Sequence, residues 1–151
     1  MVVLHSTGGP TCDGRRPIWV PAGELRENIR TIEAHRRLGV HYMIDRDGTV
    51  VASVPEGRVA YHVFTYSKRS LGIELVNDGD GADPYPEPQL AALVGLLQQI
   101  TRRYAIGPVG IRRHSDLDQG RMPCAPERRR KVDPGAAFPY EEVMRRVFAA
   151  P

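Results

Sequence analysis

The stretch SLGIELVN at residues 70–77 decides the fold class of this 151-residue chain. It is a short and nearly continuous apolar run, and Glu74 is the charged residue that interrupts it. Such a run is typical of a strand covered on both faces, because a strand with one solvated face would alternate polar and apolar residues. Residues 2–4, which read VVL, form a similar run, and His5 follows them where the strand would leave the core. Both runs therefore predict buried strands.

Helical patterns alternate with these strands along the chain. Residues 22–39 place apolar side chains at helical spacing and end in Gly39, which predicts an amphipathic helix. Residues 88–104 carry a stronger apolar pattern and predict the main core helix, and a short final helix is expected over residues 140–148. Strands that alternate with helices predict an α/β fold, with a central β-sheet flanked by helices in a single domain over residues 1–151.

The segments between these elements predict one hairpin, one further strand and two loops. Residues 40–57 alternate in polarity around Asp47-Gly48, a dipeptide that tolerates the positive φ of a tight turn, and they predict a β-hairpin. The sequence GPVGI at residues 107–111 resembles a short strand. The Pro- and Arg-rich segment that ends at Pro21 and the long polar segment that ends at Asp133 are expected to be loops.

Composition restricts the class of protein. A hydrophobic content of 41% suits one globular domain, and no apolar run approaches the roughly 18 residues of a membrane span, so no membrane insertion is expected. The net charge of +3 is weak support for a polyanionic partner. The sequence lacks the aromatic strand of RNA-binding domains, and its few aromatic residues are scattered, so no nucleic-acid partner is expected. No basic-then-apolar export signal precedes the first strand, and the localisation and oligomeric state stay open.

Several polar residues stand at strand ends or inside apolar strands. His114 follows the strand-like residues 109–111 as His5 follows residues 2–4, so adjacent strand ends would bring the two rings together. Two histidines and a carboxylate from separate segments match a catalytic zinc, which takes three protein ligands and leaves a fourth position for water. No local HExxH-type motif is present, so spacing alone leaves structural or surface histidines as the alternative. The residues considered are His5, His41, His62, Glu74, His114 and Asp133.

Seven short motifs cover most of the chain in a fixed order: VVLHSTGG, HYMIDRDGTVVASVPEG, AYHV, SLGIELVN, YPEPQLAALVGLL, RRHSD and KVDPGAAFPY. In this order they resemble the zinc-dependent N-acetylmuramoyl-L-alanine amidases of the amidase-2 family, which is similar to phage amidase-type lysozymes and peptidoglycan recognition proteins. The resemblance implies a mixed central sheet flanked by helices. It also implies a zinc ion in a groove that binds the glycan and its stem peptide.

The same resemblance implies a role for each matching residue. His5 and His114 match the two zinc histidines of the family, and Asp133 in KVDPG matches its third ligand. Glu74 matches the acidic residue that works beside the zinc-bound water. Lys131 matches the basic residue held near the scissile carbonyl.

The chemistry of these side chains agrees with the implied roles. A carboxylate can take a proton from water and pass it to the leaving amine, and burial among apolar neighbours would raise the pKa of Glu74. Lys131 lies two residues before Asp133, so an extended backbone would direct both side chains to one cavity, where the lysine can stabilise an oxyanion. His62 in AYHV matches a histidine that often lines the family's site.

The third metal ligand has an alternative. The segment from His114 to Asp133 is longer than the loop usual in the family, and it contains Cys124, which is itself competent to bind zinc. Asp133 is preferred, because the following Pro-Gly turn can hold its carboxylate, whereas Cys124 lies in the middle of the loop. Cys12 and Cys124 can be paired, free or metal-bound.

The expected function is zinc-dependent hydrolysis of the amide bond between the lactyl group of N-acetylmuramic acid and L-alanine of the peptidoglycan stem peptide. The cofactor is Zn²⁺, and the partner is peptidoglycan or a soluble muropeptide. The alternative is a non-catalytic peptidoglycan-binding module of the same fold. The sequence does not decide between polymeric and soluble substrates.

Overall fold

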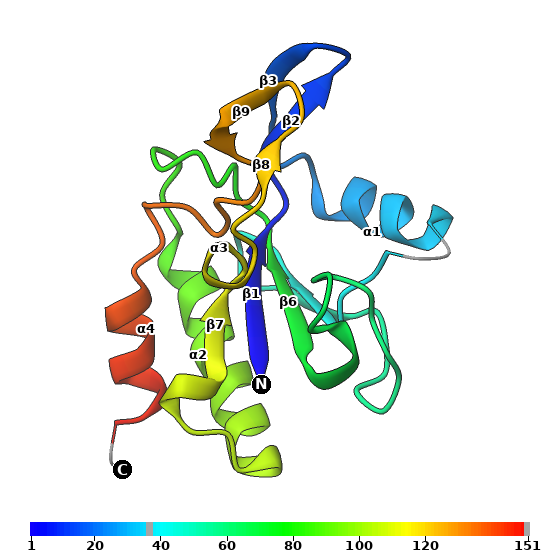
Figure 1. Ribbon diagram of the computed structural model, residues 1–151. Coiled ribbons are helices and arrows are strands. Elements are labelled where there is room, and N and C mark those ends of the chain that lie inside the picture. Colours follow the sequence, from blue (N-terminus) through cyan, green and yellow to red (C-terminus); the bar gives the residue numbers. More distant parts are fainter. Residues whose placement is uncertain (36–37, 150–151) are drawn as a thin grey trace.

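A five-stranded mixed β-sheet forms the centre of the computed structural model, which describes residues 1–35 and 38–149 (Figure 1). The neighbouring strands β4, β6, β1 and β7 run parallel, and the edge strand β5 pairs antiparallel with β4. This arrangement confirms the expected α/β class with a mixed sheet. Across the sheet the strands are β5 (Val50–Ala52), β4 (Tyr42–Ile44), β6 (Leu71–Leu75), β1 (Val2–Ser6) and β7 (Ile111–Arg113).

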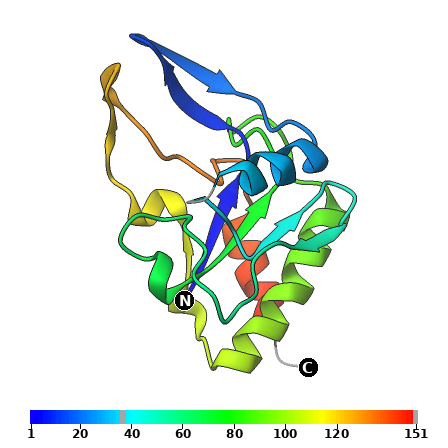
Figure 2. The same ribbon diagram turned by 90° about the vertical axis from the view of Figure 1, so that its right-hand side faces the viewer.

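The two faces of the sheet carry different side chains, because successive side chains of a strand point to opposite faces. On one face, apolar residues of β1 and β6 pack into a common core with α2 (Glu87–Tyr104) and α4 (Tyr140–Val147), which lie side by side (Figures 1 and 2). His5 in β1 and Glu74 in β6 are each one position away from these core residues, and they therefore project from the opposite face. Buried members of the core include Val2, Leu4, Ile73, Leu75, Leu93, Leu97, Ile100 and Val143.

Helix α2 matches the expected core helix closely. Pro88 lies in its first turn, where a missing N–H leaves no hydrogen bond unmade, and Ala105 ends it in the left-handed conformation. Helix α4 matches the expected final helix, and α1 (Leu25–Ala34) occupies most of the first predicted helix. That prediction extended over residues 36–37, which lie outside the described residues. None of the helices in residues 1–35 and 38–149 combines the length and apolar character that crossing a membrane requires.

Two segments that were expected to be loops contain hairpins instead. The first hairpin is formed by β2 (Gly9–Asp13) and β3 (Arg16–Val20), and the second by β8 (Arg121–Met122) and β9 (Ala125–Arg129). Every residue of β3 is exposed, so this strand has no buried face to produce an alternating pattern. The expectation of loops was wrong here because backbone pairing, not burial of one face, defines these strands.

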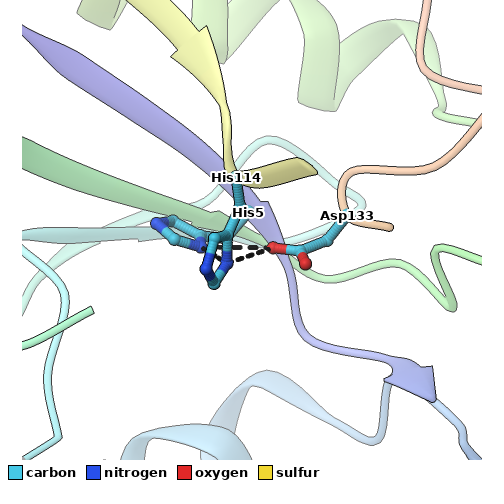
Figure 3. Close-up of side chains that lie close together, drawn as sticks. All are labelled: His5, His114 and Asp133. Atoms are coloured by element: carbon cyan, nitrogen blue, oxygen red, sulfur yellow. Dashed lines mark hydrogen bonds and ion pairs between the residues drawn. The ribbon is translucent and has the colours of Figure 1, made fainter. Parts of the chain in front are cut away.

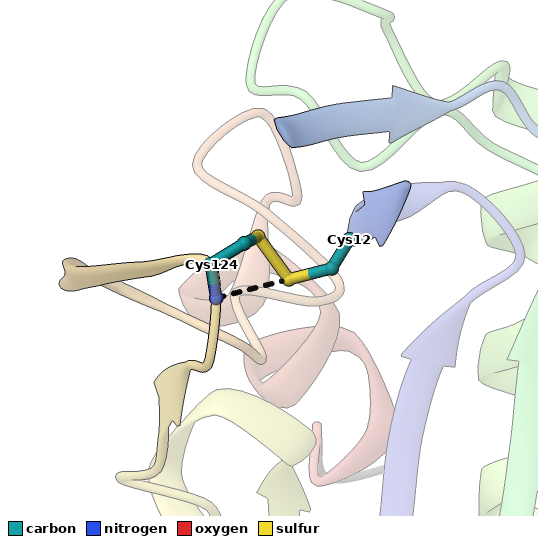
Figure 4. Close-up of a disulfide and its surroundings, with 2 residues drawn as sticks. All are labelled: Cys12 and Cys124. Atoms are coloured by element: carbon teal, nitrogen blue, oxygen red, sulfur yellow. Dashed lines mark hydrogen bonds between the residues drawn. A yellow bond between two sulfur atoms is a disulfide. The ribbon is translucent and has the colours of Figure 1, made fainter. Parts of the chain in front are cut away.

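A disulfide joins the two hairpins. Cys12 of β2 bonds to Cys124, which lies in the turn between β8 and β9, although 112 positions separate them (Figure 4). The backbone N–H of Cys124 also donates to Sγ of Cys12. The pairing answers the question that the sequence left open, because Cys124 is bonded to sulfur and is therefore not available as a metal ligand.

The remaining elements differ only in their bounds. The hairpin around Asp47-Gly48 is present as β4 and β5. The strand expected at residues 107–111 begins later, since Pro108–Gly110 forms a 3-10 turn and β7 starts at Ile111. Strand β7 therefore ends directly before His114, which begins the short helix α3 (His114–Leu117). A further 3-10 turn covers Ser67–Arg69.

Candidate active site

The strand register brings His5 and His114 together. Strand β1 pairs in parallel with β7, and Leu4 lies opposite Arg113 at the end of that pairing. The next residue on each chain segment is His5 and His114, so both rings stand at the carboxyl ends of adjacent strands. Both residues are buried, with exposures of 3% and 4%.

Local hydrogen bonds bring Asp133 to the same place. Its carbonyl oxygen accepts the N–H of Ser115, which ties this turn to the start of α3 (3.0 Å). The hydroxyl of Tyr85 donates to the carbonyl of Pro134 (2.6 Å), and Gly135 has a φ of +86°. A side chain at Gly135 would also place a Cβ 2.5 Å from the carbonyl oxygen of Gly79. The turn after Asp133 therefore depends on a glycine and on a buried tyrosine.

Three potential ligand atoms converge at this point (Figure 3). Nδ1 of His5 lies 2.9 Å from Nδ1 of His114, and Oδ2 of Asp133 lies 3.2 Å from the first ring and 3.0 Å from the second. Tetrahedral zinc with bonds of about 2.1 Å separates its ligand atoms by about 3.4 Å, so the three atoms are spaced nearly as zinc would require. Two imidazoles and one carboxylate are also the donor types that zinc accepts. The residues therefore fit a metal site.

The electrostatics of this cluster favour the ligand forms of the side chains. Burial lowers the pKa of His5 below its usual value, against the opposing effect of Asp133, so the ring is neutral at pH 7. Burial alone would raise the pKa of Asp133, but its hydrogen bond with His114 and the nearby ring of His5 outweigh this effect and hold that pKa below its usual range. A neutral imidazole and an ionised carboxylate are the states that bind a metal ion.

His62 is in contact with the far side of the His5 ring. Nε2 of His5 lies 2.9 Å from Nδ1 of His62, and Nε2 of His62 lies 3.2 Å from the hydroxyl of Ser70. That hydroxyl donates to the carbonyl of Tyr66 (2.8 Å), which leaves it to accept from His62. We therefore assign a chain of hydrogen bonds in which Nε2–H of His5 donates to His62 and Nε2–H of His62 donates to Ser70. This chain leaves Nδ1 of His5 free of a proton and directed toward His114 and Asp133, the other potential metal ligands.

The position of His62 depends on Gly72 of the neighbouring strand β6. A Cβ at residue 72 would lie only 2.6 Å from Cγ of the His62 ring, so the absence of a side chain makes room for the imidazole. Burial lowers the pKa of His62 to about 3, with His5 contributing in the same direction, and the ring is neutral. The sequence predicted His62 as a residue that lines the site, and it does border the cavity. Its hydrogen bond to His5 was not predicted.

Glu74 and Lys131 border the same cavity as the three potential ligands. Glu74 lies opposite His5 in the β1–β6 pairing and projects from the same face. Burial raises the pKa of Glu74 to about 8, with Asp133 adding to the effect and Lys131 opposing it. The cavity has a volume of about 400 Å³, and its walls include residues of α1 and of both hairpins. A carboxyl group with high proton affinity and an exposed ammonium group therefore share one cavity with the potential metal ligands.

His41 has a structural role. It is buried, its Nε2–H donates to the carbonyl of Arg58 (3.1 Å), and its Nδ1 accepts the N–H of Gly72 (3.0 Å). Both ring nitrogens are thus used by backbone groups. Within the described residues, the group of side chains able to hold a metal ion is His5, His114 and Asp133.

Comparison with known proteins identifies relatives over most of the chain. The family described as N-acetylmuramoyl-L-alanine amidase (Amidase_2) matches residues 1–136. The chain is 38% identical over 115 residues to the 1,6-anhydro-N-acetylmuramyl-L-alanine amidase AmpD of Enterobacter cloacae, which covers 71% of this chain and 56% of that protein. It is 31% identical over 112 residues to the N-acetylmuramoyl-L-alanine amidase AmiD of Escherichia coli K12, covering 64% of this chain and 37% of that protein.

A solved structure shares the fold over nearly the whole chain. The complex of AmiD from E. coli with the substrate anhydro-N-acetylmuramic acid-L-Ala-D-gamma-Glu-L-Lys superposes with a TM-score of 0.76 and 23% identity, over 99% of this chain and 57% of that one. The chain thus spans just over half the length of that structure and of the E. cloacae relative. Because the family match covers residues 1–136, the chain belongs to the N-acetylmuramoyl-L-alanine amidase (Amidase_2) family.

Proposed function

We propose that this chain is a zinc-dependent amidase that hydrolyses the bond between the lactyl group of N-acetylmuramic acid and L-alanine of the stem peptide. The observation that carries the proposal is the meeting of His5, His114 and Asp133 in one cavity with Glu74 and Lys131. The substrate class is supported by the names of the relatives, which refer to muramyl-L-alanine amides. His5, His114 and Asp133 would hold the zinc ion.

When bound, zinc would polarise the scissile carbonyl and lower the pKa of a water molecule at the open coordination position. Glu74 is the general base and then the general acid in this proposal. Its carboxylate accepts a proton from the attacking water and delivers it to the nitrogen of L-alanine as the amide bond breaks. Burial raises the pKa of Glu74 above its usual value, and the charge of a bound zinc ion would oppose that effect, so the group could both lose and gain a proton near neutral pH.

Lys131 supplies positive charge at the wall of the cavity. Its ammonium group would stabilise the negative charge that develops on the carbonyl oxygen during the attack of water. The turn that carries Asp133 begins two residues after Lys131, so the same backbone segment presents a metal ligand and this cation. The reaction therefore needs one carboxyl group for proton transfer and one cation for charge stabilisation, and the cavity holds both.

The proposal is tested with a soluble disaccharide-peptide of known structure. Incubation with the zinc-loaded protein should release an intact peptide that begins with L-alanine, detected by mass spectrometry, without new reducing ends on the sugar. Chelation should remove both the bound zinc and the cleavage, and added Zn²⁺ should restore them. Stoichiometric binding of the muropeptide by zinc-loaded protein without any cleavage would refute the enzyme and favour the binding module.

A further inference from the structure

The two hairpins form a single projecting unit, which we call the two-hairpin arm (residues 9–20 and 121–130). Both hairpins extend from the end of the sheet at which the candidate active site lies (Figures 1 and 2). The disulfide ties one to the other, and the indole N–H of Trp19 donates to the carbonyl of Asp78 (2.8 Å) at the base of the first. The arm is therefore held together and fixed to the domain.

The net positive charge of the arm exceeds that of the whole chain. It has six arginines and two acidic residues, a net charge of +4, whereas the complete chain has +3. The other 129 residues consequently have a net charge of −1. The net positive charge of the molecule is therefore located in the arm, whereas positive and negative side chains nearly balance in the rest of the chain.

Several of these arginines are available to a ligand. Arg130 forms an ion pair with Asp118 (2.8 Å), and Arg129 donates to the carbonyls of Ser115 and Asp118. These two guanidinium groups therefore already have partners within the protein. Arg15, Arg16 and Arg128 are exposed and form no ion pair with any residue of 1–35 or 38–149. Arg121 is also exposed, and within the described residues its side chain donates only to the carbonyl of Glu127.

The arm begins at the wall of the cavity and leads away from it. Pro10, Thr11 and Val20 of the first hairpin and Arg130 of the second line the cavity. A volume of about 400 Å³ is near the lower end for pockets that hold a small ligand, so a long glycan with several stem peptides must extend beyond it. Such a polymer carries a carboxylate on each stem peptide, and these groups recur along its length.

We propose that the two-hairpin arm binds carboxylates of polymeric peptidoglycan outside the cavity, and that the chain therefore prefers the polymer to soluble muropeptides. This inference rests on the proposed function and names the substrate class for the same site. Several weak contacts between the arm and one glycan strand act together, because each contact raises the local concentration of the remaining carboxylates near the arm. A single disaccharide-peptide held in the cavity lacks the neighbouring stem peptides that the arm would contact.

The test compares two triple variants that remove equal charge. The arm variant is Arg15→Gln, Arg16→Gln and Arg128→Gln, and the control is Lys68→Gln, Arg102→Gln and Arg145→Gln, all of them exposed positions. The substrates are peptidoglycan sacculi with their phosphodiester polymers, sacculi stripped of these polymers, and a soluble disaccharide-peptide. An exposed ion pair changes a binding constant by about twofold to threefold, so the arm variant should bind stripped sacculi roughly tenfold more weakly in low salt.

The outcomes separate the inference from the proposed function. The arm variant should also release peptides from sacculi more slowly, with unchanged turnover of the soluble substrate, and the control should match the parent protein on both. Equal binding of sacculi by the three proteins, or an equal loss on both substrates, would overturn the inference. A loss seen only with sacculi that retain their phosphodiester polymers would assign the arm to those polymers instead. Failure of the parent protein to cleave the soluble substrate would refute the proposed function itself.

Discussion

Replacing Gly72 by alanine tests the hydrogen-bonded chain that orients His5 without removing a polar group. The added Cβ would lie 2.6 Å from Cγ and 2.7 Å from Nδ1 of His62, whereas ordinary carbon contacts begin near 3.4 Å. The imidazole must therefore move by roughly 1 Å, and its hydrogen bond to His5, now 2.9 Å, would exceed the limit of about 3.5 Å. Losing such a partner of a metal ligand weakens metal affinity by about 10–100-fold. We expect a loss of this size for zinc.

The assay is a competition titration in which the protein and a chromophoric chelator share limiting zinc. Gly95→Ala is the matched control, since a Cβ there meets no atom within 4 Å and zinc affinity should stay unchanged. His62→Ala should weaken zinc binding by a similar factor to Gly72→Ala. The double variant Gly72→Ala/His62→Ala should then be no weaker than His62→Ala alone, because the methyl group has no ring left to displace. Additive losses in the double variant would refute the reasoning and point to distortion of β6 itself.

Three further predictions use other parts of the structure. Glu74→Gln should retain zinc but lower kcat by about 10²–10⁴-fold, because the amide cannot carry the proton, and loss of zinc affinity in the same variant would contradict this role. Cys12→Ser/Cys124→Ser should lower the free energy of unfolding by about 2–4 kcal/mol in denaturant titrations, since the crosslink closes a loop of 112 positions, and zinc affinity should persist. Burial lowers the pKa of His41 in the folded state, so the unfolded state takes up the proton first as the pH falls below about 6.5. The free energy of unfolding should therefore fall between pH 7 and pH 5, with a smaller slope in His41→Gln, and equal slopes would assign the effect to other histidines.

The strands and helices with a buried face could be predicted from the sequence, because burial leaves a periodic pattern. The run at residues 70–77 and the helix at residues 88–104 are examples, and both lie against the common core. The two-hairpin arm leaves no such pattern, since β3 is exposed at every position. One local signal was present, because Asp13-Gly14 lies at the turn of the first hairpin as Asp47-Gly48 does in the hairpin of β4 and β5. The disulfide had no local signal at all.

In the candidate site, too, some residue positions follow from the sequence pattern, whereas others depend on contacts between residues far apart in the sequence. Once two parallel strands are recognised as neighbours, the residues that follow them must meet at one edge, which explains why the positions of His5 and His114 could be inferred together. Asp133 comes from an irregular segment, and its place depends on the N–H of Ser115 and on the hydroxyl of Tyr85, contacts that no pattern of residues reveals. The contact of His62 with His5 requires the missing side chain of Gly72, which lies on a different strand. Residue types and order therefore predict the chemistry of this site, whereas its geometry depends on the contacts of residues that take no part in that chemistry.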